Sequence, residues 1–393
     1  MGLIDRFLRT KPSSAGALPL SEKGGPKEGA VPPESGGNLG ILDVAAALRW
    51  IKINIAAFGG DPGRVTLVGH DTGAALVNLL FISPSSKGLF KRVVLLSGTA
   101  LSPWATIHDA DSLRVSVGRQ TGCLQQQQQE ESQDTEDIAA CLRSRPLQAL
   151  LDIQLETVRF MPRIAPSLPI DLDTPDPAYA MEHASENFIT SELMLGITTT
   201  ESYGDFNAND IQYGFEEDQR NRVLRTYIRN AYVYHLNEIF SAVRNEYTDW
   251  DKPIQHPINI RDSTMEALSD GHTVSPLVRV AYLHARRGAK TYFFHFGYQT
   301  KESDYPQDLT YILGLPLVGG QPHFPQNYTR QDMGVAEATL VFFSNFAKSG
   351  DPNGPGVHKD VPDYGTPREK TRYRGLTWDP YEIGTQFYLS ISK

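Results

Sequence analysis

The chain has 393 residues, of which 40% are hydrophobic and 21% charged, and this globular composition excludes a wholly disordered protein. Its 37 basic and 46 acidic residues give a net charge of −9, which disfavours nucleic acid and anionic membranes as partners. No apolar run approaches the ~20 residues of a membrane-spanning helix. The first residues also lack the uninterrupted apolar stretch of a signal peptide.

Two segments of the chain are of low complexity. Residues 1–37 are dominated by Pro, Gly, Ser, Lys, Glu and Ala, and this composition predicts a linker or disordered segment in front of a folded region, 38–393. The second segment, 124–133, is rich in glutamine. It predicts an exposed loop insertion.

Between these segments, apolar helices and short strands alternate. Apolar residues spaced three and four apart predict a helix over 41–55 that ends near Gly59. A β-branched strand is predicted at 65–68, and a helix at 74–82. This order predicts an α/β protein with a mainly parallel sheet covered on both faces. Further strands are predicted at 93–96, 193–197, 291–296 and 387–391, and further helices at about 216–247, 273–287 and 330–348.

The turn Gly69-His70-Asp71-Thr72-Gly73 stands between the strand at 65–68 and the following helix. A strand, a tight turn with glycine on both sides and a helix are typical of a nucleophile elbow, where hydrolases carry serine and this chain carries Asp71. An aspartate is itself the nucleophile in α/β hydrolases that open epoxides, but that chemistry needs a histidine base. We expect the His70 side chain to point away from that of Asp71. A catalytically inactive site is therefore favoured over an Asp-nucleophile hydrolase, which remains the alternative.

A series of motifs around and after this turn carries a specific resemblance. Together they resemble the cholinesterase and type-B carboxylesterase family from about residue 37 to the end, and within it the neuroligins of invertebrates, an adhesion branch without catalysis. The resemblance implies an α/β-hydrolase fold. The motifs are FGGDP at 58–62, SP at 83–84, GLF at 88–90, SG at 97–98, GLPL at 314–317, NFAK at 345–348 and GDPN at 350–353.

The resemblance also locates the family's catalytic triad. The nucleophile position holds Asp71, the acid position Glu201 and the base position Tyr305. A phenol with a pKa near 10 does not replace imidazole as a base at neutral pH. Nothing before Gly37 resembles the family's glycine-rich oxyanion loop. We therefore expect a pseudo-esterase, in which one of the two facing carboxyl groups, Asp71 or Glu201, has a raised pKa. An active carboxylesterase-like hydrolase stands beside the Asp-nucleophile hydrolase as the alternative.

The resemblance further implies adhesion at synapses by binding a neurexin-type ectodomain. Thr199, Glu201 and Tyr203 align with part of the partner-facing surface. No cofactor or metal is expected, and calcium only at the partner interface. We expect a chain cut at both ends from a longer protein of the postsynaptic cell surface. That full-length protein would form homodimers through a C-terminal helix that this chain does not contain.

Two further features bear on an extracellular location. The only cysteines are Cys123 and Cys141, which the resemblance pairs in a disulfide, and two free thiols are the alternative. Asn327 begins the sequon Asn-Tyr-Thr, where the resemblance implies N-linked glycosylation. Both features agree with an oxidised, glycosylated ectodomain.

Overall fold

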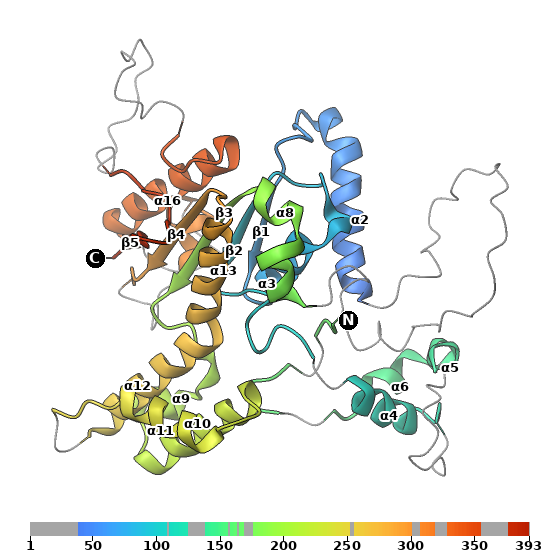
Figure 1. The fold of residues 1–393 in the computed structure, drawn as a ribbon, viewed down its shortest axis with the longest axis vertical. Coiled ribbons are helices and arrows are strands. Elements are labelled where there is room, and N and C mark those ends of the chain that lie inside the picture. The colour runs from blue at the N-terminus through green and yellow to red at the C-terminus, as the bar shows by residue number, and fades with distance from the viewer. Residues whose placement is uncertain are drawn as a thin grey trace. The chain divides into compact units, whose positions relative to one another are not determined.

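The structure is a computed structural model. The predicted linker at 1–37 and most of the glutamine-rich tract lie outside the residues that it describes. The chain packs as two compact units, a smaller one from residues 1–46 and 106–175 and a larger one from residues 47–105 and 176–393 (Figure 1). The described residues are 38–107, 110–124, 138–155, 158–162, 165–168, 176–251, 255–300, 307–318, 328–354 and 376–392.

The larger unit is built on a five-stranded sheet, as the alternation of strands and helices predicts. Its strands are paired in parallel in the order β1-β2-β3-β4-β5, which confirms the parallel α/β prediction for the described residues. β1 runs two residues further than predicted because pairing with β2 continues through His70, opposite Leu96. The strands are β1 (Thr66–His70), β2 (Arg92–Leu96), β3 (Glu192–Thr198), β4 (Thr291–Phe296) and β5 (Leu389–Ile391).

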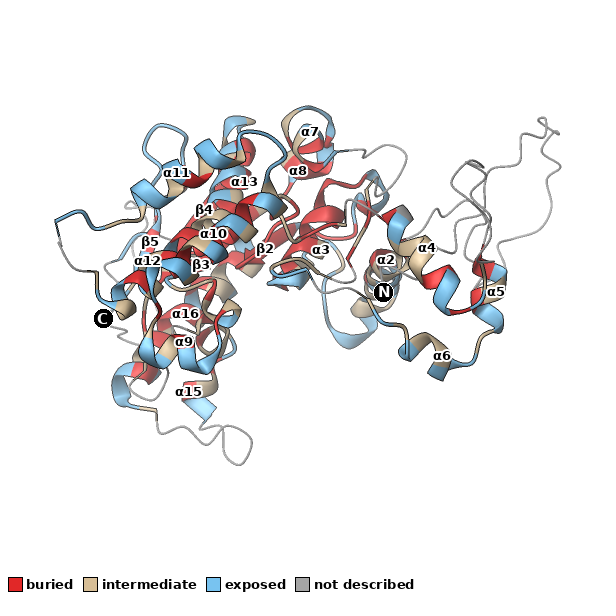
Figure 2. Ribbon diagram, turned by 90° about the horizontal axis from the view of Figure 1, so that it is seen from below, coloured by how far each residue is buried: buried red, intermediate tan, exposed pale blue. Residues whose placement is uncertain are grey.

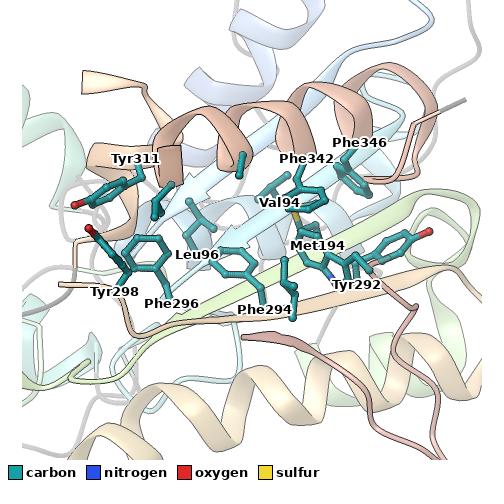
Figure 3. Packing of buried hydrophobic residues seen from close by; sticks show 14 of the residues in the cluster. Val94, Leu96, Met194, Tyr292, Phe294, Phe296, Tyr298, Tyr311, Phe342 and Phe346 are labelled. Carbon is teal, nitrogen blue, oxygen red and sulfur yellow. The ribbon is translucent and has the colours of Figure 1, made fainter. Parts of the chain in front are cut away.

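The two faces of this sheet are covered by different helices. Alternate residues of β4, Tyr292, Phe294 and Phe296, join a buried apolar cluster with α16 (Arg330–Ser349), as Figure 3 shows. The other face packs against α3 (Thr72–Ile82) and α13 (Ser275–Arg286). The interior strands β2 and β3 are almost entirely buried (Figure 2). This burial explains why their sequences are continuously apolar rather than alternating.

Local sequence sets where these helices begin and end. α16 begins at a capping box, in which Thr329 and Asp332 bond each other's backbone N–H groups, and it ends at Gly350 with a positive φ of 76°. The helix predicted over 216–247 is two helices, α10 (Glu217–Ala231) and α11 (Leu236–Glu246). They are separated by a short turn in which His235 also has a positive φ, of 56°.

A helix that the apolar spacing did not predict precedes α13. This helix, α12 (Pro257–Ser269), begins with a proline and continues through a π-helical turn, η5 (Asp270–Val274), into α13. The remaining elements of the larger unit are η1 (Ile55–Phe58), η2 (Pro84–Ser86), α7 (Pro177–Tyr179), η3 (Ala180–Ala184), α8 (Glu186–Thr190), η4 (Tyr203–Asp205), α9 (Ala208–Tyr213), α14 (Asp308–Ile312) and α15 (Leu315–Val318), and α2 (Leu39–Asn54) has residues in both units.

The smaller unit is helical and contains the two cysteines. Its helices are α4 (Ala110–Gln120), α5 (Ala139–Ser144) and α6 (Leu147–Leu151). Cys123 and Cys141 form a disulfide with a Cα–Cα distance of 5.7 Å, which confirms the pairing and excludes the free thiols. The bridge lies beside a small apolar cluster that includes Val117 and Leu142. In neither unit does a described helix combine the length and the apolar character needed to cross a membrane.

Candidate functional site

The turn after β1 has the backbone geometry of a nucleophile elbow. Asp71 has φ 53° and ψ −123°, a conformation that a non-glycine residue adopts only under strain. Its N–H donates to the carbonyl of Leu96 (2.8 Å), and its own carbonyl accepts from the N–H of Ala74 (2.9 Å). A Cβ at Gly69 would lie 2.6 Å from the Ala74 Cα, and a Cβ at Gly98 would lie 2.4 Å from the backbone carbonyl oxygen of Asp71. The glycines are therefore required for the close approach of strand and helix.

A cavity of about 570 Å³ lies beside this turn, and we call it the elbow cavity. Asp71 and Glu201, the first two predicted triad positions, both line it. The cavity lies at the carboxyl ends of the parallel strands, the usual place for ligands in open α/β sheets. Its other lining residues with chemically active or hydrogen-bonding side chains include His70, Ser97, Thr200, Asp205 and Asp308.

Glu201 is held by hydrogen bonds from its own chain. Its Oε1 accepts from the Thr198 backbone N–H (2.5 Å) and from the Ser97 hydroxyl (3.0 Å). Burial is the main cause that raises the pKa of Glu201 from 4.5 to about 7; the negative charge of Asp308 contributes to this rise, and the hydrogen bonds from Thr198 and Ser97 oppose it. A raised pKa was predicted for one of two facing carboxyl groups. The acidic neighbour that contributes to it is Asp308, however, and not Asp71.

Asp308 is an acidic cavity residue that sequence reasoning missed. It is only 2% exposed at the start of α14, and its Oδ1 accepts from the Leu309 N–H at 2.7 Å. Its Oδ2 is buried without a hydrogen-bond partner. Burial raises the pKa of Asp308, and the nearby His70 opposes this shift. The available sequence signal was an acidic residue placed directly before the apolar run of α14.

His70 lines the elbow cavity together with Asp71. It is close enough to Asp308 to lower the pKa of that carboxyl group. That the His70 side chain points away from that of Asp71 stays a prediction. The base position, Tyr305, lies outside the described residues.

The three residues predicted to face a partner have different environments. Thr199 is exposed, and its hydroxyl is 3.0 Å from Nε2 of His295. Tyr203 is partly buried and lines the elbow cavity. The Glu201 carboxyl group is turned inward, toward Ser97 and Thr198. Contact of these residues with a partner stays a prediction, as does glycosylation of Asn327, which is not among the described residues.

The chemistry that this site supports follows from the side chain at the elbow. Acyl transfer by a triad needs a hydroxyl or thiol nucleophile at the turn, and the elbow presents a carboxylate. The hydroxyl of Ser97 is committed to Glu201. Within the described part of the chain, no group of three or more His, Cys, Asp or Glu residues is arranged to hold a metal ion. The backbone of an esterase elbow is thus present, but the nucleophile position holds an aspartate in place of a serine.

Comparison with known proteins shows which protein family the chain belongs to. The chain belongs to the carboxylesterase family, whose sequence model matches residues 31–393. More particularly, it is similar to neuroligins. It is 31% identical to neuroligin-3 of Mus musculus in an alignment of 369 residues that covers 90% of this chain and 43% of that protein. It is 31% identical to neuroligin-1 of Caenorhabditis elegans in an alignment of 355 residues that covers 83% of this chain and 44% of that protein.

A third relative gives the same result and shows the extent of the match. The chain is 29% identical to human neuroligin-2 in an alignment of 367 residues that covers 90% of this chain and 42% of that protein. The chain therefore spans less than half the length of the curated relatives it matches.

Proposed function

We propose that this chain is a catalytically inactive esterase-like domain of a neuroligin-like cell-adhesion protein, which binds a neurexin-type partner at synapses. The observation that carries the proposal is Asp71 at the strained centre of the elbow, in a chain similar to neuroligins. Its place of action would be the extracellular face of the postsynaptic membrane. The Cys123–Cys141 disulfide supports an oxidising compartment.

The inactivity follows from the chemistry of the triad positions. A carboxylate that attacks an ester forms an anhydride, and no serine at the elbow offers the ordinary acyl-enzyme route. Glu201 bonds Ser97 and Thr198, so its carboxyl group is held within its own chain. A phenol at position 305 would not act as the general base near neutral pH.

The proposed partner surface includes Thr199 and Tyr203 at the end of β3. Thr199 is the exposed member, whereas Glu201 would support the loop from inside. Calcium would be held mainly by the partner. In the full-length protein, we expect a homodimer formed outside this chain.

The direct test is surface plasmon resonance with an invertebrate neurexin ectodomain, with calcium and with a chelator. We expect a Kd of about 1 µM or tighter with calcium and at least tenfold weaker binding without it. Thr199→Arg should weaken binding at least tenfold, whereas Thr226→Arg, at a partly exposed position on α10, should not. Absence of binding with calcium at tens of micromolar would reject the adhesion proposal.

A second candidate function, an Asp-nucleophile hydrolase, is favoured by His70 beside Asp71 in the elbow cavity. An Asp71 oxygen would form a C–O bond to an epoxide carbon while the ring C–O bond breaks and the ring oxygen takes a proton from water. Water deprotonated by His70 would then hydrolyse the resulting ester. Incubation with styrene oxide should give a diol and a trapped adduct on Asp71. Both should disappear in Asp71→Asn but persist in Asp218→Asn. If wild type forms neither, this candidate fails.

A further inference from the structure

The elbow cavity has an acidic lining that the proposed adhesion does not explain. Four of its described lining residues carry carboxyl groups, and none is a lysine or an arginine. Carboxyl groups that lie close together raise one another's pKa, and a bound cation relieves this repulsion. The carboxyl groups come from the elbow, from the segment after β3 and from α14, and they are Asp71, Glu201, Asp205 and Asp308.

Two buried polar atoms of the lining have no hydrogen-bond partner. One is Oδ2 of Asp308, in a residue that is 2% exposed, and the other is the hydroxyl oxygen of Thr200. Buried polar groups are nearly always paired, so an unpaired acceptor beside a cavity indicates a missing donor. Asp308 belongs to the acidic lining, whereas the Thr200 hydroxyl is a second observation outside it. An ionised carboxylate oxygen only accepts and a hydroxyl can accept, so a ligand with N–H or O–H donors would satisfy both atoms.

We propose that the elbow cavity binds a small organic cation with N–H donors, of the primary alkylammonium class. The positive charge would lie among the four carboxyl groups. One N–H would be donated toward Asp308 and a second toward Thr200, with modest adjustment of these side chains. A primary ammonium carries three donors, which suits two separated acceptors. A quaternary ammonium has the same charge but no N–H, so it would leave both acceptors unpaired.

The protonation states of the cavity support this assignment. Burial raises the pKa of both Glu201 and Asp308, so without a ligand these carboxyl groups hold protons more tightly than ordinary ones. A bound cation would favour their ionised forms, and binding would therefore release protons. His70, when protonated, would compete for the same carboxyl groups. Among the described residues, the titratable groups that line the cavity are His70, Asp71, Glu201, Tyr203, Asp205 and Asp308. Asp205 also faces His272, whose Nδ1 lies 3.7 Å from the Asp205 Oδ2.

The experiment is calorimetric titration of the full chain with butylammonium chloride at pH 8, with tetramethylammonium chloride at equal ionic strength as comparator. We expect butylammonium to bind with a Kd of about 1 mM and tetramethylammonium at least tenfold more weakly. Asp308→Asn, which keeps the shape of the side chain, should weaken butylammonium binding at least tenfold. Asp218→Asn on α10 removes an exposed carboxyl group and should leave it unchanged.

A second measurement uses only the wild-type chain, in case Asp308→Asn fails to fold. In ¹⁵N-labelled protein, butylammonium should shift the amide signals of Thr200 and Leu309 more than tetramethylammonium does. Equal binding of the two cations, unchanged binding in folded Asp308→Asn, or amide shifts confined to residues away from the cavity would each overturn the proposal. Since no neurexin is present, failure here leaves the proposed adhesion function untouched.

Discussion

The apolar cluster beneath α16 and the elbow cavity lie in the same unit, but they differ in whether their buried polar groups have hydrogen-bond partners. In the cluster, Trp378 is 2% exposed and its indole N–H donates to the Phe293 carbonyl at 3.1 Å. Asp332 accepts from the hydroxyl of Tyr298 at 2.7 Å. In the elbow cavity, Asp308 keeps an unpaired oxygen and Asp71 keeps a strained backbone. The paired polar groups of the cluster stabilise the fold. The unpaired oxygen and the strained backbone at the cavity lower the stability of the fold.

The largest expected effect is in the apolar cluster. Trp378→Ala should lower the free energy of unfolding by about 3–5 kcal/mol, because it opens a cavity among packed rings and leaves the Phe293 carbonyl without its donor. Urea unfolding measures this change. Trp250→Ala is the control, since Trp250 is 66% exposed and should cost under about 1 kcal/mol. Similar losses for the two variants would contradict the description of the cluster.

The disulfide tests whether stability also depends on the smaller unit. Cys123→Ser should lower the stability of that unit by about 3 kcal/mol, as expected from chain entropy for a bridge between residues 18 apart. Protection of amide hydrogens in α4 and α5 measures this loss. Addition of a reductant should reproduce it in wild type and have no further effect in the variant. Unchanged protection in α5 would argue that packing alone holds this unit.

The raised pKa of Glu201 predicts that the free energy of unfolding falls as the pH rises. Its folded-state pKa, about 7, exceeds the ordinary value of 4.5, so the folded protein binds this proton more tightly than the unfolded chain. Stability from this group is therefore present below pH 4.5 and is lost as pH rises through 7. Glu201→Gln removes the titration, so from pH 5 to pH 8 it should gain about 2 kcal/mol relative to wild type.

Urea unfolding of both proteins at the two pH values measures this difference. Glu246→Gln, at the exposed end of α11, is the control and should follow the wild-type profile. A constant difference between wild type and Glu201→Gln would show that Glu201 titrates alike in the folded and unfolded chains.

The smallest expected effect is a gain in stability at the elbow itself. Asp71→Gly should raise the free energy of unfolding by about 1 kcal/mol, because glycine adopts a φ of 53° without the clash of a Cβ. Asp71→Ala keeps the Cβ and should show no such gain. Thermal unfolding of the two variants isolates the backbone contribution. A glycine variant no more stable than the alanine variant would mean that the turn is not strained.

Local patterns predicted those elements whose signal lies within a few residues. The β-branched run before Gly69 predicted β1, and glycine spacing predicted the elbow at Asp71. α12 was missed because apolar residues do not dominate its sequence. Its start is signalled by Pro257, and a proline also occurs in many turns.

The chemistry of the site was less accessible to sequence because its contacts join distant parts of the chain. Ser97 and Glu201 are 104 residues apart, and Asp308 reaches the cavity from α14. No spacing in the sequence encodes such a juxtaposition, which arises only when β2, β3 and α14 are placed by the fold. The resemblance supplied Glu201 by position, but the pairing with Asp308 required the structure.

The claim that an esterase framework here lacks esterase chemistry is tested most directly by ester turnover. The purified 393-residue chain at pH 7.5 should hydrolyse p-nitrophenyl butyrate no faster than the Asp71→Ala variant at equal concentration. Turnover by wild type that Asp71→Ala abolishes, with both proteins giving the same cooperative melting transition, would contradict this account.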